Sequence, residues 1–287
     1  MLLDAEDRVN TTPLTTHLAT TGSVEMGDDR TMTGGPRTFD PAYGIDELLA
    51  AKAGRRVTVC IPARNEERTV GRVVDAVRRS HGAAGSGLVD EVLVVDDGSA
   101  DATGAVAGAA GARVLTLPAG GGGKGQAMAA GVAAAAGDLL VFLDADVENT
   151  TGTFVAGLLG PLLVEEDVAL VKGFYQRPLH GQSDGGGRVT ELMARPVIEV
   201  LFPGLVDVRQ PLAGETAAPR WVLEKVALAS GYGVELGLLV DVAARFGAGS
   251  IAQVDLGVRV HRNRPLEELR PQAVEILKVA LERAGLP

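Results

Sequence analysis

The sequence predicts an α/β protein with a mostly parallel central sheet, helices on both faces and an irregular C-terminal part. Apolar, β-branched runs at 57–62, 91–97, 112–118 and 138–146 are typical of strands that are covered on both faces. Stretches with helical spacing or many Ala residues separate these runs. Strands that alternate with helices favour a parallel sheet, in which ligands bind beyond the carboxyl ends of the strands.

The remaining elements follow from local patterns. Ile45, Leu48 and Leu49 suggest a short helix that ends near Gly54. Val residues at helical spacing between 70 and 77 predict a helix after the first run, and an Ala-rich helix is expected at 126–136. The second half is less regular, with strands expected at 168–175 and 250–261 and helices opening at 185–191 and covering 231–246 and 265–285.

The length of 287 residues allows one large domain or two small ones. Residues 1–40 are rich in Thr, Gly, Asp and Met without an apolar period, so we expect a flexible N-terminal tail. No internal repeat is visible in the rest. We therefore expect 41–287 to form a single domain.

Charge and composition exclude several classes of protein. The net charge is −10 and aromatic residues are 3% of the chain, so neither a phosphate-neutralising basic stripe nor a base-stacking platform is expected, and nucleic acid is not a predicted partner. The single cysteine, Cys60, cannot form an internal disulfide, which favours a reducing, cytoplasmic location. Acidic residues near the start and the lack of an 18-residue apolar run predict neither a signal peptide nor a membrane span.

Asp144-Ala145-Asp146 directly follows the fourth apolar run. Two carboxylates at the end of a strand can reach one hard cation, and Mg²⁺ or Mn²⁺ prefers oxygen ligands that it shares with substrate phosphates. The alternative is that this pair of Asp residues simply ends the strand and starts a turn.

Two other polar segments follow the first and second strands. Asp96 and Asp97 precede a turn in which Ser99 and Asp101 can cap the next helix, but capping does not explain two consecutive Asp residues at the sheet edge. An Asp there can accept a hydrogen bond from a ring N–H of a base. The segment 62–67 suits either the first turn of a helix or contact with a nucleoside.

A glycine run at 120–123 precedes Lys124. It matches the dinucleotide-binding pattern trivially and follows the third strand rather than the first, so a dehydrogenase is not favoured. We interpret it as a flexible loop that brings Lys124 to a phosphate, with a plain solvent loop as the alternative.

The segments VTVCIPARNEE, VLVVDDGSADAT, GGKGQAM and LVFLDAD together resemble the nucleotide-sugar glycosyltransferases with the GT-A fold. The later segments GGGRVTELMARP, QPLAGETAAPR, GYGVELGLLVD and IAQVDLGVRVHRNRPL are similar to the glucosyl-3-phosphoglycerate synthase family of retaining enzymes. The resemblance implies a nucleotide-sugar half at 41–147 and an acceptor half at 148–287. It departs from the family at Asp97, where Ser is usual, and in the glycine run.

The resemblance implies that glucose moves from UDP-glucose to 3-phosphoglycerate with the help of Mg²⁺ or Mn²⁺. It implies that Asp146 and His261 hold the metal. The residues it implies for donor binding are Pro62, Ala63, Glu66, Asp97, Lys124, Asp144, Ala145 and Tyr232. Catalytic roles fall on Glu235, Lys124 and Asp146.

For the acceptor, the resemblance implies that Gly187, Arg188, Thr190 and Asn263 bind the phosphate and carboxylate of 3-phosphoglycerate. Backbone N–H groups after the glycines and the guanidinium of Arg188 suit a phosphate, although a turn with a solvated Arg188 is the alternative. For His261 and Glu235 the corresponding alternatives are a surface histidine and a solvated helix residue.

Several other functions stay open at this point. The same fold can use another nucleotide sugar or another small acceptor, and a nucleotidyltransferase or a non-catalytic sugar-nucleotide sensor would carry similar strand ends. We expect a homodimer, although the residue pattern itself does not determine the oligomeric state.

Overall fold

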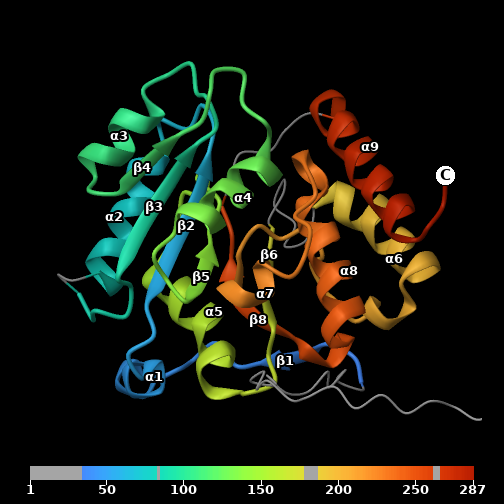
Figure 1. The fold of residues 1–287 in the computed structure, drawn as a ribbon, viewed down its shortest axis with the longest axis horizontal. Coiled ribbons are helices and arrows are strands. Elements are labelled where there is room, and N and C mark those ends of the chain that lie inside the picture. Colours follow the sequence, from blue (N-terminus) through green and yellow to red (C-terminus); the bar gives the residue numbers. More distant parts are fainter. Residues whose placement is uncertain (1–33, 83–84, 178–186, 261–265) are drawn as a thin grey trace, which may run out of the picture. The chain divides into compact units, whose positions relative to one another are not determined.

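A computed structural model describes residues 34–82, 85–177, 187–260 and 266–287. These residues form an eight-stranded mixed sheet in the order β1-β8-β6-β7-β5-β2-β3-β4 (Figure 1). The strands are β1 (Arg37–Phe39), β2 (Val57–Ala63), β3 (Glu91–Asp96), β4 (Arg113–Thr116), β5 (Leu139–Phe142), β6 (Leu170–Gln176), β7 (Thr216–Pro219) and β8 (Ile251–Val258). β7 runs antiparallel to β5 and β6, and the other neighbouring pairs are parallel. The predicted mostly parallel α/β sheet is confirmed.

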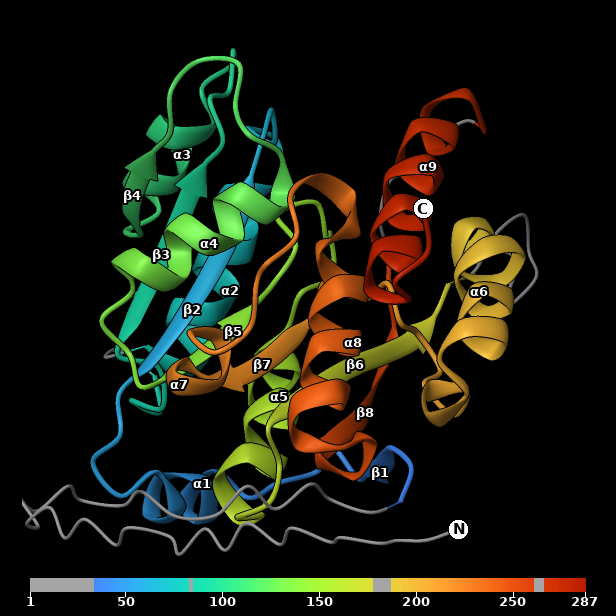
Figure 2. The same cartoon turned by 45° about the vertical axis from the view of Figure 1, so that its right-hand side comes forward.

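Helices cover both faces of the sheet (Figures 1 and 2). One apolar cluster contains side chains of α1 (Ile45–Lys52), α2 (Val70–His81), α3 (Thr103–Ala109) and α5 (Gly152–Val164). The other contains side chains of α4 (Lys124–Ala134), α6 (Arg195–Leu201), α7 (Arg220–Leu223), α8 (Val234–Phe246) and α9 (Leu266–Arg283). In β2, Val59 and Ile61 belong to the first cluster and Cys60 to the second, because successive strand residues point to opposite faces.

Several elements differ from the sequence prediction, and three of them bear on the core and the sheet. Residues 37–39, which the sequence places in the tail, form β1 and pair with β8. α5 was not predicted because it is apolar around its whole circumference and shows no helical period. β7 was not predicted because its residues, TAAP, are small and carry little strand preference.

The C-terminal part contains irregular helical structure after β6, as the sequence predicts. A π-helical turn over Thr190–Ala194 (η1) leads directly into α6. A 3₁₀ turn over Gly231–Gly233 (η3) leads into α8 and thereby places Glu235 in the first helical turn. Within the described ranges, none of the helices combines the length and the apolar character needed to cross a bilayer.

Candidate active site

The loops that follow β2 and β3 are tied to each other by side chains. The Asn65 amide N–H donates to Ser99 Oγ at 3.0 Å, and Asn65 Oδ1 accepts from the Ala100 N–H at 2.8 Å. The Glu66 N–H donates to Thr103 Oγ1 at 2.8 Å, and Glu67 Oε2 accepts from the Ala102 N–H at 3.0 Å. These bonds tie the two loops to each other before α2 and α3 begin, and the N-cap residues Thr69 and Ala102 form no side-chain cap hydrogen bond. The prediction that Ser99 caps the next helix is therefore wrong, whereas Asp101 Oδ1 does accept from the N–H of Thr103, the first residue of α3, at 3.0 Å.

Asp97 anchors the glycine run. Its side chain is 5% exposed, its Oδ1 accepts from the Gly122 N–H at 2.8 Å and its Oδ2 accepts from the Gly123 N–H at 3.0 Å. A Cβ on Gly121, where φ is +60°, would lie 2.7 Å from Asp97 Oδ2. The loop therefore requires glycine for its backbone conformation and is bound to the end of β3.

Lys124, the first residue of α4, lies between two carboxylates. Its Nζ is 2.5 Å from Asp144 Oδ1 and 2.6 Å from Glu235 Oε1. Burial would lower the pKa of Lys124, but the charges of Asp144 and Glu235 outweigh burial and raise it. The lysine is therefore held as a cation at the centre of the site.

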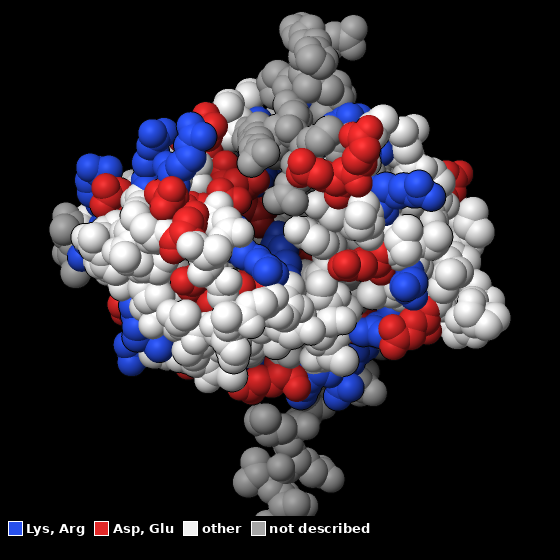
Figure 3. Space-filling view, turned by 90° about the horizontal axis from the view of Figure 1, so that it is seen from above, with Lys and Arg blue, Asp and Glu red and all other residues white. Residues whose placement is uncertain are grey.

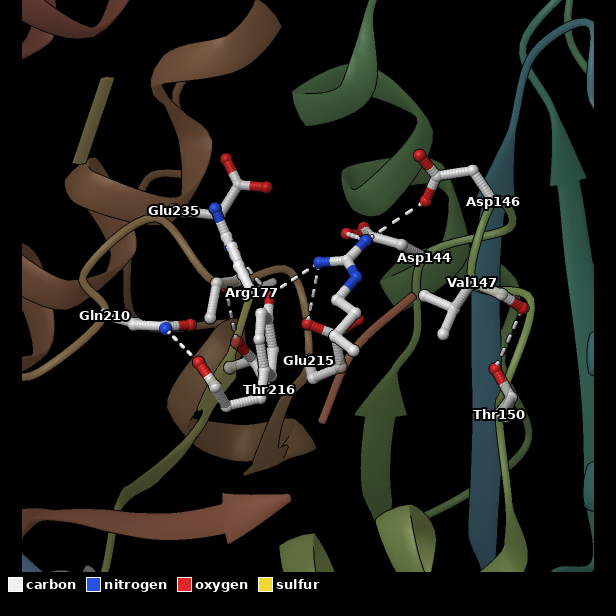
Figure 4. A network of polar contacts seen from close by, with 12 residues as sticks. Asp144, Asp146, Val147, Thr150, Arg177, Gln210, Glu215, Thr216 and Glu235 are labelled. Carbon is white, nitrogen blue, oxygen red and sulfur yellow. Dashed lines mark hydrogen bonds and ion pairs between the residues drawn. The ribbon is translucent and has the colours of Figure 1, made fainter. Parts of the chain in front are cut away.

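Asp144 and Asp146 share a second cation, Arg259, which follows β8 and is 5% exposed. Arg259 Nη2 donates to Asp144 Oδ2 at 2.8 Å and to Asp146 Oδ1 at 3.1 Å (Figure 4). Burial would raise the pKa of Asp144, but Lys124 and Arg259 outweigh it and hold this pKa well below its usual range. A Cβ on Gly214 would overlap the Asp144 carboxylate, so any other residue at this turn would displace that carboxylate.

The other side of Arg259 faces buried polar groups that the sequence did not indicate. Its Nη1 donates to Tyr175 OH at 2.5 Å and to Glu215 Oε2 at 3.3 Å. Glu215 has no exposed surface, and burial raises its pKa despite the nearby guanidinium. The sequence does contain a signal for Glu215, because it is an acidic residue inside the segment QPLAGETAAPR, which consists mainly of small residues. A charged side chain is rarely buried in such a segment unless a residue of opposite charge pairs with it.

Lys172 lies beneath this network and is 1% exposed. Its Nζ donates to the Ala213 carbonyl at 2.5 Å and to Thr216 Oγ1 at 3.1 Å. Burial lowers the pKa of Lys172 to about 8. These bonds hold the turn from Ala213 to Glu215 against Asp144.

The predicted acceptor segment starts beside β6. Gly187 has a φ of +78°, Thr190 is 3% exposed and Arg188 is partly buried. Arg177, which the sequence did not indicate, has its Nη1 3.5 Å from the position of a Cβ on Gly187. His261 and Asn263 lie outside the described residues.

The remaining predicted donor residues lie around the same sheet edge. Pro62 and Ala63 end β2, and the Asp97 N–H donates to the Ala63 carbonyl at 2.9 Å. Ala145 is buried between the two Asp residues. The Tyr232 N–H donates to Glu275 Oε2 at 2.8 Å, and Gly231 N–H donates to Gln126 Oε1 at 3.3 Å, so the turn before α8 is tied to α9 and α4.

The structure thus brings Lys124, Asp144, Asp146 and Glu235 together from both halves of the chain. Seen from above, acidic and basic side chains gather in one hollow of the surface (Figure 3). The described residues contain no cluster of three or more His, Cys, Asp or Glu suited to a metal ion. The oxygens of Asp144 and Asp146 nevertheless converge on one cationic atom, Arg259 Nη2, and hard carboxylate oxygens in this arrangement fit a divalent cation.

The chain matches the family model "Glycosyl transferase family 2" over residues 58–189. The fold, the acidic pair and this match define a glycosyltransferase. It is 47% identical over 264 residues to glucosyl-3-phosphoglycerate synthase of Mycobacterium tuberculosis H37Rv, covering 86% of this chain and 79% of that protein. The synthase of Petrotoga mobilis is 42% identical over 251 residues, covering 83% and 77%. The chain belongs to the glucosyl-3-phosphoglycerate synthase family.

Solved structures agree in fold. A crystal structure of the M. tuberculosis synthase in complex with Mn²⁺, UDP-glucose and phosphoglyceric acid has a TM-score of 0.81 and 45% identity, covering 89% of both chains. Another, in complex with Mg²⁺ and UDP, has a TM-score of 0.79 and 46% identity, covering 88% of both chains. The GT-A type fold that the sequence predicts is confirmed by this similarity.

Proposed function

We propose that this protein transfers glucose from UDP-glucose to 3-phosphoglycerate with retention of configuration, giving glucosyl-3-phosphoglycerate and UDP. The observation that carries the proposal is the lysine held at 2.5 Å from Asp144 and 2.6 Å from Glu235, in a chain of this family. One cation between a donor-side and an acceptor-side carboxylate suits a reaction in which charge develops on a leaving phosphate.

The donor and a divalent cation bind at the end of β5 in this proposal. Asp146 and His261 hold Mg²⁺ or Mn²⁺, which when bound neutralises charge on the leaving diphosphate. Asp144 and Ala145 face the ribose, while Pro62, Ala63, Glu66 and Asp97 surround the nucleoside. The two loops after β2 and β3 present these groups in a fixed arrangement, because their side chains already satisfy loop N–H groups.

Lys124 stabilises the departing phosphate oxygens electrostatically. It does so as a permanent cation, since its pKa is raised by Asp144 and Glu235. A lysine that is already oriented by two carboxylates need not reorganise during the reaction, which is the condition under which electrostatic stabilisation is effective.

Glu235 orients the hydroxyl of the acceptor, with Tyr232 beside it in the turn that opens α8. No side chain is placed as a separate nucleophile in this proposal. The acceptor attacks the face from which the diphosphate leaves, and the leaving phosphate takes the proton of the hydroxyl. Gly187, Arg188, Thr190 and Asn263 bind the acceptor anions.

The test is mass spectrometry of the products formed from UDP-glucose or GDP-glucose with 3-phosphoglycerate and Mg²⁺ or Mn²⁺. We expect glucosyl-3-phosphoglycerate and UDP from the first donor. In a parallel reaction with UTP and glucose 1-phosphate, release of pyrophosphate would identify a nucleotidyltransferase, and binding of UDP-glucose without turnover would identify a sensor. Either outcome would overturn the proposal.

We also propose that the protein is a cytoplasmic homodimer. Its lone cysteine, Cys60, is buried, and burial raises the pKa of its thiol to about 12, which suits a structural residue in a reducing compartment. Light scattering of the purified protein measures the oligomeric state, and cell fractionation measures the location. A monomer at micromolar concentration would contradict the proposed homodimer.

A further inference from the structure

Two arginines stack on the ring of Tyr175, a 3%-exposed residue in β6. The guanidinium carbons of Arg177 and Arg259 lie 4.9 Å and 5.1 Å from the ring centroid. Both also donate to the same hydroxyl, Arg177 through Nη2 at 2.9 Å and Arg259 through Nη1 at 2.5 Å. Tyr175 therefore fixes the orientation of both guanidinium groups.

The two arginines differ in what balances their charge. Arg259 has three carboxylate partners, Asp144, Asp146 and Glu215. Arg177 forms no ion pair with a carboxylate of the described residues, and its Nε is buried without a hydrogen-bond partner among them. A positioned guanidinium with unused N–H groups, in a protein of net charge −10, is a site for an external anion.

The place of Arg177 indicates which anion. Arg177 Nη1 lies 3.5 Å from the position that a Cβ on Gly187 would occupy, and the Cβ of Thr190 is 3.9 Å from the same point. Gly187 and Thr190 belong to the proposed acceptor segment. Arg177 is thus directly beside the residues that would bind the acceptor, while Arg259, which donates to the same Tyr175 hydroxyl, contacts the acidic pair.

We propose that Arg177 binds an anionic group of the acceptor, a phosphate or a carboxylate, and that Tyr175 is its positioning residue. This inference rests on the proposed function for the identity of the acceptor. The planar guanidinium can donate two parallel hydrogen bonds to either anion. Arg177 is then a specificity-determining residue on the acceptor side that adds to Arg188.

The test uses the full chain with Arg177→Gln and Arg177→Lys, and Arg209→Gln as the matched control. Arg209 is exposed and stacks on the neighbouring ring of Phe174 at 4.5 Å, so it loses a comparable contact without touching Tyr175. Acceptor affinity is measured by calorimetry with 3-phosphoglycerate in the presence of UDP and Mn²⁺. Acceptor and donor KM values are measured in parallel.

We expect Arg177→Gln to weaken 3-phosphoglycerate binding by about 10- to 100-fold, the usual cost of losing charged hydrogen bonds, with the KM for UDP-glucose unchanged. Arg177→Lys should bind 3-phosphoglycerate more tightly than Arg177→Gln, because lysine keeps the positive charge but lacks the planar guanidinium that donates two parallel hydrogen bonds. Arg209→Gln should leave both values unchanged. Titrations with glycerol 3-phosphate and D-glycerate assign the anion: the ligand whose binding falls in Arg177→Gln carries the group that Arg177 holds.

Unchanged 3-phosphoglycerate affinity in both Arg177 variants would overturn the inference. So would an equal loss of donor and acceptor affinity, because Arg177 would then only support Tyr175 and Arg259. If the proposed function itself is wrong, the wild-type protein will neither bind nor glucosylate 3-phosphoglycerate, which distinguishes that outcome from a failure of the inference about Arg177. If Arg177→Gln does not fold, thermal unfolding will show it, and Arg177→Lys then decides.

Discussion

The carboxylates after β3 and those after β5 occupy the same edge of the sheet but are satisfied in different ways. Asp97 accepts backbone N–H groups of Gly122 and Gly123, while Asp144 accepts from the side chains of Lys124 and Arg259, which are 20 and 115 residues away in the sequence. A backbone N–H cannot leave, whereas a side-chain cation can exchange with another cation. In the proposed function, the first set therefore builds the shape of the donor site and the second set supplies the charges for its chemistry.

Among the variants that test this difference, Asp146→Ala should have the largest effect on activity. It removes the carboxylate that we propose for the metal, so we expect metal-dependent transfer to fall by about a thousandfold, equivalent to several kcal/mol of lost charge stabilisation. Mn²⁺ affinity, measured by electron paramagnetic resonance, should fall with it. Glu148→Ala, an exposed acidic residue two positions on, is the control and should retain activity. Full activity of Asp146→Ala would remove the metal assignment.

Arg259→Gln tests whether a cation is needed to hold the acidic set together. It leaves the buried Glu215 and the partly buried Asp144 with one cation fewer, and breaking a buried pair costs about 3–5 kcal/mol of unfolding free energy. Urea denaturation measures this loss. Arg195→Gln, which breaks an exposed pair with Glu191, should cost no more than about 1 kcal/mol. Similar stability of the two variants would show that the buried network is not held by Arg259.

Lys172→Met tests the buried cation beneath the turn. The pKa of Lys172 is about 8 in the folded protein and 10.5 ordinarily, so between these pH values the unfolded chain binds more protons than the folded one. The unfolding free energy contributed by Lys172 therefore rises by about 3 kcal/mol from pH 8 to 10.5 and is lost as pH falls through 8. Lys172→Met should lack this rise in pH-dependent denaturation. Lys225→Met, at an exposed position, should keep it.

Asp97→Asn should have the smallest effect. It replaces one carboxylate oxygen by an NH₂ group, which cannot accept a hydrogen bond from the glycine run. The expected loss of unfolding free energy is about 1–2 kcal/mol. Hydrogen exchange of the Gly122 and Gly123 amides should accelerate, while Asp101→Asn should affect only the loops after β2 and β3. Unchanged exchange at both glycines would show that Asp97 does not anchor this loop.

The parts of the fold that could be predicted are those whose pattern is local. The runs that form β2, β3 and β5 are mostly apolar, and the acidic pairs stand at or directly after the ends of β3 and β5. α5 and β7 could not be predicted, because an all-apolar helix and a strand of small residues show no alternation of apolar and polar residues. β1 escaped because its three residues become a strand only through pairing with β8, more than 200 residues later.

The sequence by itself determined that Asp96, Asp97, Asp144 and Asp146 meet at one sheet edge, because the carboxyl ends of parallel strands lie together. It also carried the family resemblance and the lysine after the glycine run. Only the tertiary structure decided which cations face those carboxylates and that Tyr175 holds two arginines with different partners. The physical reason is clearest for Arg259, whose contacts with Tyr175, Asp144 and Asp146 depend on the order of strands in the sheet. These residues lie more than 80 positions from Arg259, and no local sequence pattern records such a contact.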